Sequence, residues 1–473
     1  MKLNKFILFS TLAIAAVFAS CNFLDSNNND VEYSDASHFI SLSFARNDSS
    51  ANVHTAKFSV VYDVNNEFPY ADSIIVNLDS LPYNTRIDSV GATFVFASTS
   101  SAKLFVYNDE TSQYDSTFVS KPDTINFTKK IFVRNTSRNG EKKSTYGIKV
   151  NVHKVEPELF VWQKLNNGVF AHNASTQKAL LHDNRIFYYA GTGLFNYLYV
   201  SDNTSATSWT TKTLTGLPMG CDFSDMIVYK EKFYLLHDNN ALYSSSNGSD
   251  WVAVNEIATQ GFSVQQLLFV FENKLWAIAK DNNSSVFVLR SFDGNANNTW
   301  SNAIVNVPET FPLNDFTTAT FLSPTKKSKA LVLGGTRNGA IMRNAWTTEN
   351  GSYWVDFSLE NASLGNVAGA AMLYYFDRLF MFGGISANGT VRSNNMIESI
   401  DEGFTWRTPD TTYNQIRELK NDLYRTYEPR FGQSAILINN NKEILLIGGR
   451  DNLNTYSDVW KGYVNKIFFK ENE

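Results

Sequence analysis

Cysteine is nearly absent from this chain of 473 residues, which contains only Cys21 and Cys221. With two thiols, no metal site built from several cysteines can form. If Cys21 is used at the N-terminus, Cys221 has no partner for an intramolecular disulfide. Segment 219–222 contains no motif that would lower the pKa of this thiol, so Cys221 is predicted to be a buried or loop thiol and not a nucleophile.

Sequence motifs of metal sites, nucleotide sites and serine hydrolases are also missing. The six histidines are scattered and no two have the spacing of a metal site. The chain has no glycine-rich phosphate loop and no Gly-x-Ser-x-Gly elbow. Its formal charge of −5 comes from 41 basic and 46 acidic residues without a large block of either sign, so there is no basic footprint for nucleic acid. We expect no metal, no cofactor, no catalytic residues recognisable by motif, and no nucleotide or nucleic-acid partner.

Long hydrophobic runs are absent after the N-terminus, where Lys2 and Lys5 precede an apolar run over residues 6–19. This run is short for a membrane span and matches a secretory signal. Small residues then lead to Cys21, and residues 18–21 resemble the lipobox of bacterial lipoproteins. The resemblance implies that residues 1–20 are removed and that Cys21 carries acyl chains, which would anchor the protein to the outer membrane. The alternative is an ordinary signal peptide with an incidental cysteine.

Strand-forming residues dominate the rest of the chain. The sequence has 36 Phe and 22 Tyr, and 43% of its residues are hydrophobic, which favours a folded β-rich protein. Residues 21–37 are polar and read as a flexible tether. Over residues 38–156, short runs alternate between apolar and polar residues, most clearly at 145–153. The pair Asn139-Gly140 predicts a hairpin between 130–135 and this strand. We predict a small antiparallel β-sandwich of immunoglobulin type.

A repeat begins near residue 160 and recurs every 42 to 54 residues. Its first mark is a Ser/Thr–Gly box that ends in tryptophan, clearest at Ser399, Asp401, Gly403 and Trp406. This form resembles the Asp-box of bacterial neuraminidase repeats, with looser copies before Trp251 and Trp354 and degenerate ones before Trp209 and Trp300. In such a turn the Asp or Ser caps backbone donors and the glycine supplies an unusual backbone angle. We interpret these boxes as structural.

The second mark is a pair of apolar runs around a short charged turn. The turns are predicted in segments 181–186, 229–233, 271–275, 375–379 and 438–444. Three later copies end in a glycine pair, at 334–335, 383–384 and 448–449, and resemble Kelch repeats. We expect these glycines to let the inner strand pass close to a central channel.

The last repeat has no segment that could form its outer strand. Residues 160–165, which lie before the first repeat, have the pattern of such a strand. We therefore predict that this N-terminal segment completes the last blade, so that residues 157–473 form a closed six-bladed β-propeller. The predicted fold is all-β, a small immunoglobulin-like sandwich followed by this propeller. The whole chain resembles a family of Bacteroidota outer-membrane lipoproteins of unknown function with the same two modules. That resemblance implies fold and location, and no reaction.

Ligands of such propellers meet the loops between the second and third strands and the connections between blades. Candidate residues for this face are Asp222, Arg337, Tyr427, Glu428, Arg430, Arg450 and Asp451, and the connections between blades also contain Asp225, Glu309 and Asp315. The insert 409–430 has Ile416, Leu419 and Leu423 at helical spacing, which predicts a short capping helix. Arg430 and Arg450 are expected on exposed loops, where substitution would spare stability.

Two functions remain open. The first is a lipid-anchored surface or periplasmic protein that binds a glycan or a protein partner through the propeller face. The second is a glycan-processing enzyme, a glycoside hydrolase or lyase, with a pair of carboxylates across the channel. Sialidase chemistry is disfavoured because the Arg-Ile-Pro signature is missing, although segment 427–430 brings together a phenol, a carboxylate and a guanidinium.

Overall fold

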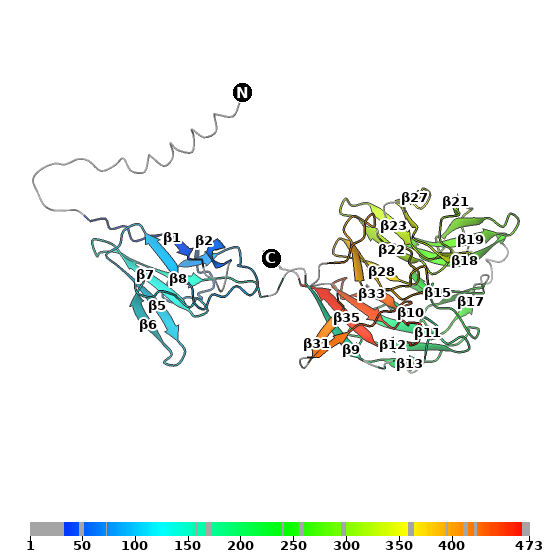
Figure 1. Cartoon of the computed structure of the whole chain (residues 1–473), viewed down its shortest axis with the longest axis horizontal. Helices are drawn as coiled ribbons and strands as arrows, with labels where there is room; N and C mark the ends of the chain where they lie inside the picture. Colours follow the sequence, from blue (N-terminus) through cyan, green and yellow to red (C-terminus); the bar gives the residue numbers. More distant parts are fainter. Residues whose placement is uncertain are drawn as a thin grey trace, which may run out of the picture. The chain divides into compact units, whose positions relative to one another are not determined.

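The computed structural model describes residues 33–46, 52–71, 73–154, 156, 159–166, 168, 170, 173–238, 241–254, 260–294, 299–357, 364–393, 396–409, 415–420 and 423–465. The predicted signal peptide, Cys21 and most of the predicted tether lie outside these residues. The chain forms two compact units, Met1–Glu156 and Pro157–Glu473 (Figure 1). Apart from one 3₁₀ turn at Val53–Thr55, every regular element of the described residues is a strand, so the all-β prediction is confirmed. No helix within these residues is long and apolar enough to cross a membrane.

The first unit contains a sheet with the strand order β2-β3-β8-β7-β5-β6 and a two-stranded sheet β1-β4. Its strands are β1 (Phe39–Phe44), β2 (Phe58–Tyr62), β3 (Ser73–Asn77), β4 (Ala92–Phe96), β5 (Ser101–Asn108), β6 (Gln113–Phe118), β7 (Ile131–Thr136) and β8 (Lys143–Lys149). Strands β3 and β8 are parallel, with Ile75 opposite Ile148. The expectation of a wholly antiparallel arrangement is therefore wrong at this pair, because strand alternation predicts which face is buried and not which strand is the neighbour.

The predicted hairpin joins β7 and β8. Gly140 has a φ of +80°, which glycine adopts without steric cost. Ser137 N–H donates to the carbonyl oxygen of Lys142 at 2.9 Å and closes the turn. Inward side chains of both sheets meet in one core, which includes Leu42, Ile75, Leu104, Ile131 and Ile148.

The second unit is a succession of antiparallel sheets in which neighbouring strands follow one another along the chain. The first three sheets are β10 (Thr176–His182), β11 (Arg185–Gly191), β12 (Asn196–Ser201) and β13 (Thr210–Lys212); β14 (Ile227–Tyr229), β15 (Lys232–His237), β16 (Ala241–Ser245) and β17 (Val252–Ala253); and β18 (Phe262–Phe271), β19 (Lys274–Asp281), β20 (Phe287–Phe292) and β21 (Val305–Asn306).

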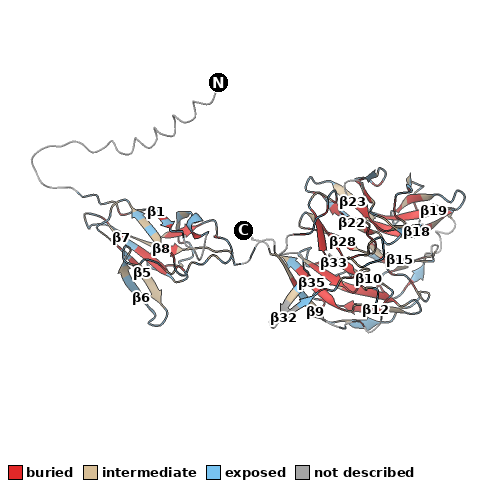
Figure 2. Ribbon diagram, in the orientation of Figure 1, coloured by how far each residue is buried: buried red, intermediate tan, exposed pale blue. Residues whose placement is uncertain are grey.

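Three further sheets continue the succession. They are β22 (Thr317–Leu322), β23 (Ser328–Leu333), β26 (Ala345–Thr348) and β27 (Val355–Asp356); β28 (Ala371–Tyr375), β29 (Arg378–Phe382) and β30 (Met396–Ser399); and β33 (Ser434–Ile438), β34 (Glu443–Ile447) and β35 (Val459–Val464) with β9 (Phe160–Asn166). Two short hairpins, β24 (Thr336–Arg337) with β25 (Ala340–Ile341) and β31 (Arg417–Lys420) with β32 (Leu423–Thr426), lie in loops. Buried residues line the strands of these sheets (Figure 2).

The first strands of these sheets form a closed ring. Strands β10, β14, β18, β22, β28 and β33 contact one another in that order, and β33 returns to β10. The last sheet takes its outermost strand from the start of the unit, because β9 pairs with β35 and places Trp162 opposite Gly462. The segment predicted to supply this strand does so.

Four of the five predicted charged turns are tight hairpins with two central residues, and the fifth, between Ile438 and Glu443, has a four-residue loop. Both central residues have positive φ at Asp183-Asn184, Lys230-Glu231, Glu272-Asn273 and Phe376-Asp377. This is the backbone of a type I′ turn, whose twist matches that of the flanking strands. Asn and Asp tolerate it readily, whereas a Lys-Glu pair is unusual, so the hydrophobic runs on either side predicted these turns better than the turn residues did.

The glycine pairs have a different role from the one expected. Each pair follows the second strand of its sheet, with φ between +62° and +100° at all six glycines. A Cβ on Gly334 or Gly383 would overlap a backbone oxygen of the next sheet, that of Val367 or Arg430 respectively. Gly335 N–H and Gly384 N–H donate to the same two oxygens at 2.7 and 2.9 Å. The pairs thus allow close backbone contact between sheets and are not spacers of the central channel.

The insert 409–430 is not helical where the structure describes it. Strands β31 and β32 form a hairpin in which Leu419 is opposite Tyr424. Ile416 is buried beside this hairpin while Leu423 is exposed. The spacing of three apolar residues resembled one helix face, but the two-residue period of each strand prevails here.

Candidate functional site

The box turns are built alike in three sheets. In each, the tryptophan Nε1–H donates to the carbonyl oxygen of the box glycine, from Trp251 to Gly248, Trp354 to Gly351 and Trp406 to Gly403, at 2.9–3.2 Å. The glycine N–H donates in turn to the hydroxyl of the residue that opens the box, which is Ser245, Thr348 or Ser399, at 2.8–2.9 Å. Asp401 accepts hydrogen bonds from both the backbone N–H and the hydroxyl of Thr405.

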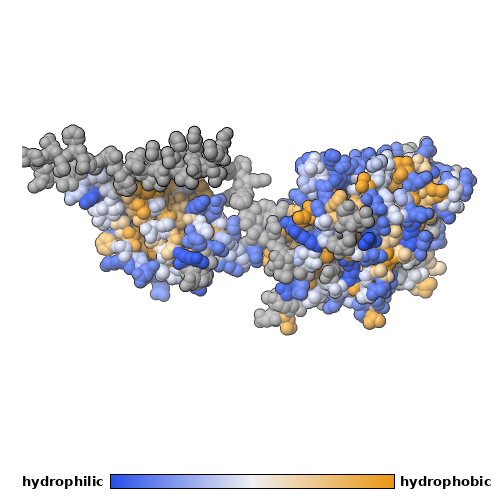
Figure 3. Space-filling model, turned by 45° about the horizontal axis from the view of Figure 1, so that its top comes forward, coloured by the Kyte–Doolittle hydropathy of each residue, from blue (hydrophilic) through white to orange (hydrophobic). Residues whose placement is uncertain are grey.

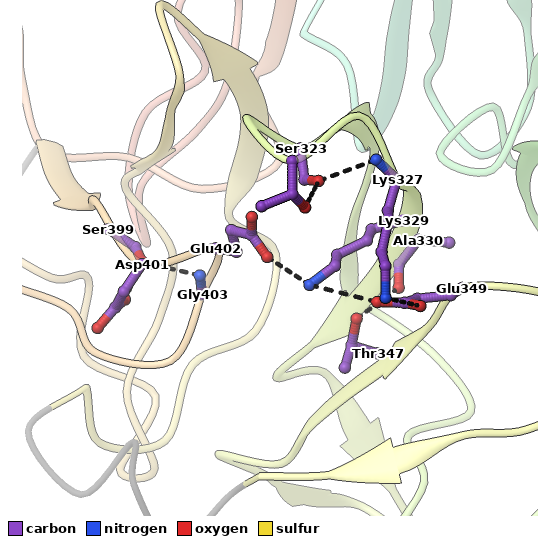
Figure 4. Close-up of polar contacts among 11 residues, drawn as sticks. Ser323, Lys327, Lys329, Ala330, Thr347, Glu349, Ser399, Asp401, Glu402 and Gly403 are labelled. Carbon is purple, nitrogen blue, oxygen red and sulfur yellow. Dashed lines mark hydrogen bonds and ion pairs between the residues drawn. The ribbon is translucent and has the colours of Figure 1, made fainter.

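Each box packs on the preceding sheet. A Cβ on Gly248, Gly351 or Gly403 would collide with Phe187, Trp276 or Leu331, all on the second strand of the sheet before. Trp406 is buried at 5% exposure. Lys329 on β23 forms ion pairs with Glu402 of the following box and with Glu349 of the box in its own sheet (Figure 4). The polar groups of the boxes are thus occupied in holding turns and neighbouring sheets together.

A fourth box of this kind is hidden in the sequence. Trp209 Nε1–H donates to the carbonyl oxygen of Ala206 at 3.1 Å, and Asn203 Oδ1 accepts from Ser205 N–H at 3.0 Å. Ala206 takes the place of glycine with a φ of +55°. The copy before Trp209 reads as degenerate because this glycine is replaced, yet its turn is retained.

A cavity of about 290 Å³ lies at the ends of β10, β22, β28 and β33. It is lined by residues 175–179, 315–318, 369–372 and 431–435, together with Asp222, Ser224 and Arg450. Backbone hydrogen bonds tie part of this rim together, from Gly432 N–H to the carbonyl oxygen of Gly369 at 2.7 Å and from Gly369 N–H to that of Asp315 at 2.8 Å. The cavity wall is therefore fixed by the ring of first strands.

One side of the cavity carries a half-buried amine, Lys178, with a half-buried acid, Asp225, near it. Lys178 on β10 donates from Nζ to the carbonyl oxygen of Ser224 at 3.1 Å. Burial lowers the pKa of Lys178, while the nearby carboxylates of Asp225 and Asp222 oppose the shift. Burial raises the pKa of Asp225 to about 7, although Leu267 N–H donates to it at 3.3 Å. Asp225 thus exchanges its proton near neutral pH.

Arg450 and Asp451 differ in their freedom to meet a ligand. Arg450 lines the cavity with its guanidinium 4.9 Å from the centre of the Phe431 ring. Asp451 is engaged in its own loop, where hydrogen bonds from the Tyr456 hydroxyl and the backbone N–H groups of Leu453 and Asn454 hold the pKa of its carboxyl well below the usual range.

The prediction that Arg430 lies exposed on the ligand face is wrong. Its side chain is buried at 1% exposure and forms an ion pair with Asp458, which is also buried. Its guanidinium lies 3.9 Å from the ring centres of both Tyr427 and Tyr456. Tyr427 is likewise fully buried, so it cannot meet a ligand at the surface. An arginine in a polar loop sequence looks solvated, because its partner is 28 residues away.

Two other candidates also fall outside the cavity lining. Glu428 is exposed, and its backbone oxygen accepts a hydrogen bond from Arg430 Nε–H at 2.9 Å. Arg337 donates to the carbonyl oxygens of Pro308 and Phe311 at 2.7 and 2.8 Å, which fixes the connection before β22. Of the predicted residues, the structure brings Asp222, Asp315 and Arg450 to one cavity, with Asp225 beside it.

Lys178 and Gln433 are among the cavity residues that the sequence did not point to. Both lie at the start of first strands, where their polar side chains read as the solvent-facing half of an alternating pattern. Cys221 is buried, and burial raises the pKa of its thiol to about 11, which matches the predicted unreactive thiol. Among the described residues, no group of three His, Cys, Asp or Glu side chains could hold a metal ion.

Both units match models of known protein families. Residues 156–472 match the family model described as DUF6242 beta propeller domain, and residues 32–150 match the N-terminal domain of DUF6242, a domain of unknown function. Among solved structures, the chain is similar to "Structure of YjhT", with 15% identity, a TM-score of 0.41, and 64% of this chain and 97% of that chain covered. It is also similar to "YCF48 bound to D1 peptide", with 11% identity, a TM-score of 0.37, and 67% and 98% covered. No curated protein matches the chain.

Proposed function

The chain belongs to the DUF6242 family, and we propose that its β-propeller is a binding module that recognises a glycan in the cavity between its first strands. The observation that carries this proposal is the lining of that cavity. It combines donors on Lys178 and Arg450, carboxylates on Asp222 and Asp315, and the ring of Phe431. Sugar recognition requires such a mixture of hydrogen-bonding groups and an apolar surface in a pre-formed pocket.

We also propose a detailed architecture for the two units. In this proposal the propeller has six blades closed by β9, and the first unit is an immunoglobulin-like sandwich. The ring of contacts from β10 to β33 and the pairing of β9 with β35 support the first point. Hydrophobic and hydrophilic residues are intermingled over the visible surface of the second unit (Figure 3).

We further propose that acylation of Cys21 anchors the protein to the outer membrane, on its surface or periplasmic side. Changing Cys21→Ser removes the residue that would carry the acyl chains. The protein should then move from the membrane fraction to the soluble fraction, because stable anchoring depends on those chains. Immunoblotting of fractionated cells measures this. Unchanged membrane association of the variant would refute the lipid anchor.

A glycan array probed with the mature chain tests the binding proposal. We expect a restricted set of glycans to bind, and we expect Arg450→Ala to weaken that binding about tenfold or more, as loss of a charge-assisted hydrogen bond would. Arg185→Ala is the matched control, since Arg185 is a partly exposed arginine at the β10–β11 hairpin. Equal binding by both variants would place the ligand elsewhere, and an array without hits would contradict glycan recognition.

One observation favours glycan hydrolysis as a second candidate function. The carboxyl of Asp225 has a pKa raised to about 7, a suitable value for a general acid, and the exposed carboxylate of Asp222 lies near it. If the propeller hydrolyses glycosidic bonds, Asp225→Asn should reduce the release of reducing sugar by about a hundredfold or more. Absence of any release from glycans that bind would leave binding as the whole function.

A further inference from the structure

Two cations of the cavity wall form no ion pair with a carboxylate among the described residues. Lys178 Nζ has the carbonyl oxygen of Ser224 as its contact, and the Arg450 guanidinium lies over the Phe431 ring. Neither forms an ion pair with any residue that the structure describes. Elsewhere in the unit, partly buried cations such as Lys164 and Lys329 do pair with carboxylates. A cation in a cavity without such a partner favours an anion that enters from outside.

The two cations come from neighbouring sheets. Lys178 is on β10, and Arg450 pairs through its backbone with Phe431, just before β33. These two strands are adjacent, and Ala179 N–H donates to the Ser434 hydroxyl at 2.8 Å between them. Asp315 lies across the cavity, before β22, which β28 separates from β33. Lys178 and Arg450 thus belong to the part of the cavity wall that β10 and β33 form, which we call its positive side.

The carboxylates near the cavity are already engaged. Asp222 accepts a hydrogen bond from Ser224 N–H at 2.8 Å, and Asp315 accepts one from the Thr336 hydroxyl at 3.1 Å. Asp225, the third, is half-protonated near pH 7 because burial raises its pKa. Asp222 and Asp225 lie near enough to Lys178 to act on its charge, but none of the three carboxylates comes within ion-pair distance of the two cations.

Gln433 also lines the cavity and is 5% exposed. Its Nε2–H donates to the carbonyl oxygen of Phe382 at 2.6 Å, so the side chain helps to hold the cavity wall in place.

We propose that the cavity binds a sugar that carries a carboxylate, with the carboxylate between Lys178 and Arg450. This proposal rests on the proposed glycan-binding function and specifies its ligand class. A volume of about 290 Å³ corresponds to roughly ten water molecules of bulk liquid. It accommodates a single sugar residue, so the acidic residue is a glycan terminus whose remainder lies outside.

Titration of the mature full-length chain with matched sugars tests this. The probes are glucuronate, galacturonate and mannuronate, each paired with its neutral hexose, and binding is measured by calorimetry or ligand-observed NMR. We expect at least one uronate to bind tenfold or more tightly than its hexose. Lys178→Gln and Arg450→Gln should each remove this preference, because each weakens uronate binding far more than hexose binding. Arg185→Gln, the matched control, should change neither affinity.

The outcomes separate this proposal from the one on which it rests. If hexoses bind as tightly as uronates, the proposed recognition of a carboxylate is wrong, while the proposed glycan binding still stands. A preference that survives both substitutions would also overturn the proposed recognition, by placing the carboxylate elsewhere. No binding of any sugar, here and on the array, would overturn both. Thermal unfolding of each variant shows whether it is folded. If Lys178→Gln does not fold, the test relies on Arg450→Gln alone.

The pH provides a second readout. The charged groups around the positive side are Lys178, Arg450, Asp222, Asp225 and, across the cavity, Asp315. As the pH falls from 8 to 6, Asp225 gains a proton and loses its negative charge, so uronate affinity should rise while hexose affinity stays constant. Asp225→Asn should abolish this rise. A uronate affinity that falls on acidification would contradict the proposed site.

Discussion

Replacing Arg430 by alanine is expected to destabilise the propeller by about 3–5 kcal/mol, because it leaves the carboxylate of Asp458 buried without its main partner. Burial alone would raise the pKa of Asp458, but Arg430 holds it below the usual value. The substitution also removes hydrogen bonds to the carbonyl oxygens of Glu428 and Gly448. Chemical denaturation of the two variants Arg430→Ala and Arg450→Ala measures the difference.

Arg450→Ala is the matched control, since Arg450 lies at the cavity and makes no ion pair with a described residue. Its free energy of unfolding should stay within about 0.5 kcal/mol of the unaltered chain. Because the pKa of Asp458 is depressed, the stabilisation from the ion pair is present above the ordinary pKa of aspartate and is lost as the pH falls through the lower, folded-state value. If both variants unfold alike, Arg430 is not a buried structural residue.

A chain that begins at residue 171 should aggregate or lose most of its stability. It lacks β9, and so exposes the edge of β35 along its length. It also loses Trp162, which is 4% exposed and packs near Phe382 at a ring-centroid distance of 6.2 Å. Burial of Trp162 and its neighbour Phe160 alone contributes several kcal/mol, at about 1.5–3 kcal/mol for a large apolar side chain.

A chain that begins at residue 157 is the control, because it lacks the first unit and keeps β9. It should unfold cooperatively at a temperature close to that of the second unit in the full chain. Size-exclusion chromatography and calorimetry of the two chains test this directly. Equal stability of both would show that β9 does not complete the last sheet.

Features set by local sequence were predictable from it. The box turn at Ser399–Trp406, the two-residue hairpins and the closing strand each follow from a few residues whose backbone requirements are specific. The box before Trp209 shows the limit of this reasoning, since Ala206 adopts a positive φ normally reserved for glycine. There the surrounding turn and the Trp209 hydrogen bond impose a conformation that the residue itself does not favour.

Features set by distant residues were not predictable. Arg430 reads as a surface loop residue until Asp458, Tyr427 and Tyr456 are seen around it. Likewise, the insert's apolar spacing cannot separate a helix from the β31–β32 hairpin. The positive side of the cavity joins Lys178 and Arg450 across most of the propeller sequence, and only closure of the ring brings them together.

We propose that ligands bind in the cavity at the ends of the first strands. Hydrogen–deuterium exchange of the full chain, with and without the best-binding sugar from the array, tests this binding site. We expect slower exchange confined to segments 175–179, 222–224, 431–435 and the backbone at Arg450. Protection confined to the box turns, such as 399–406, or to the first unit would contradict it.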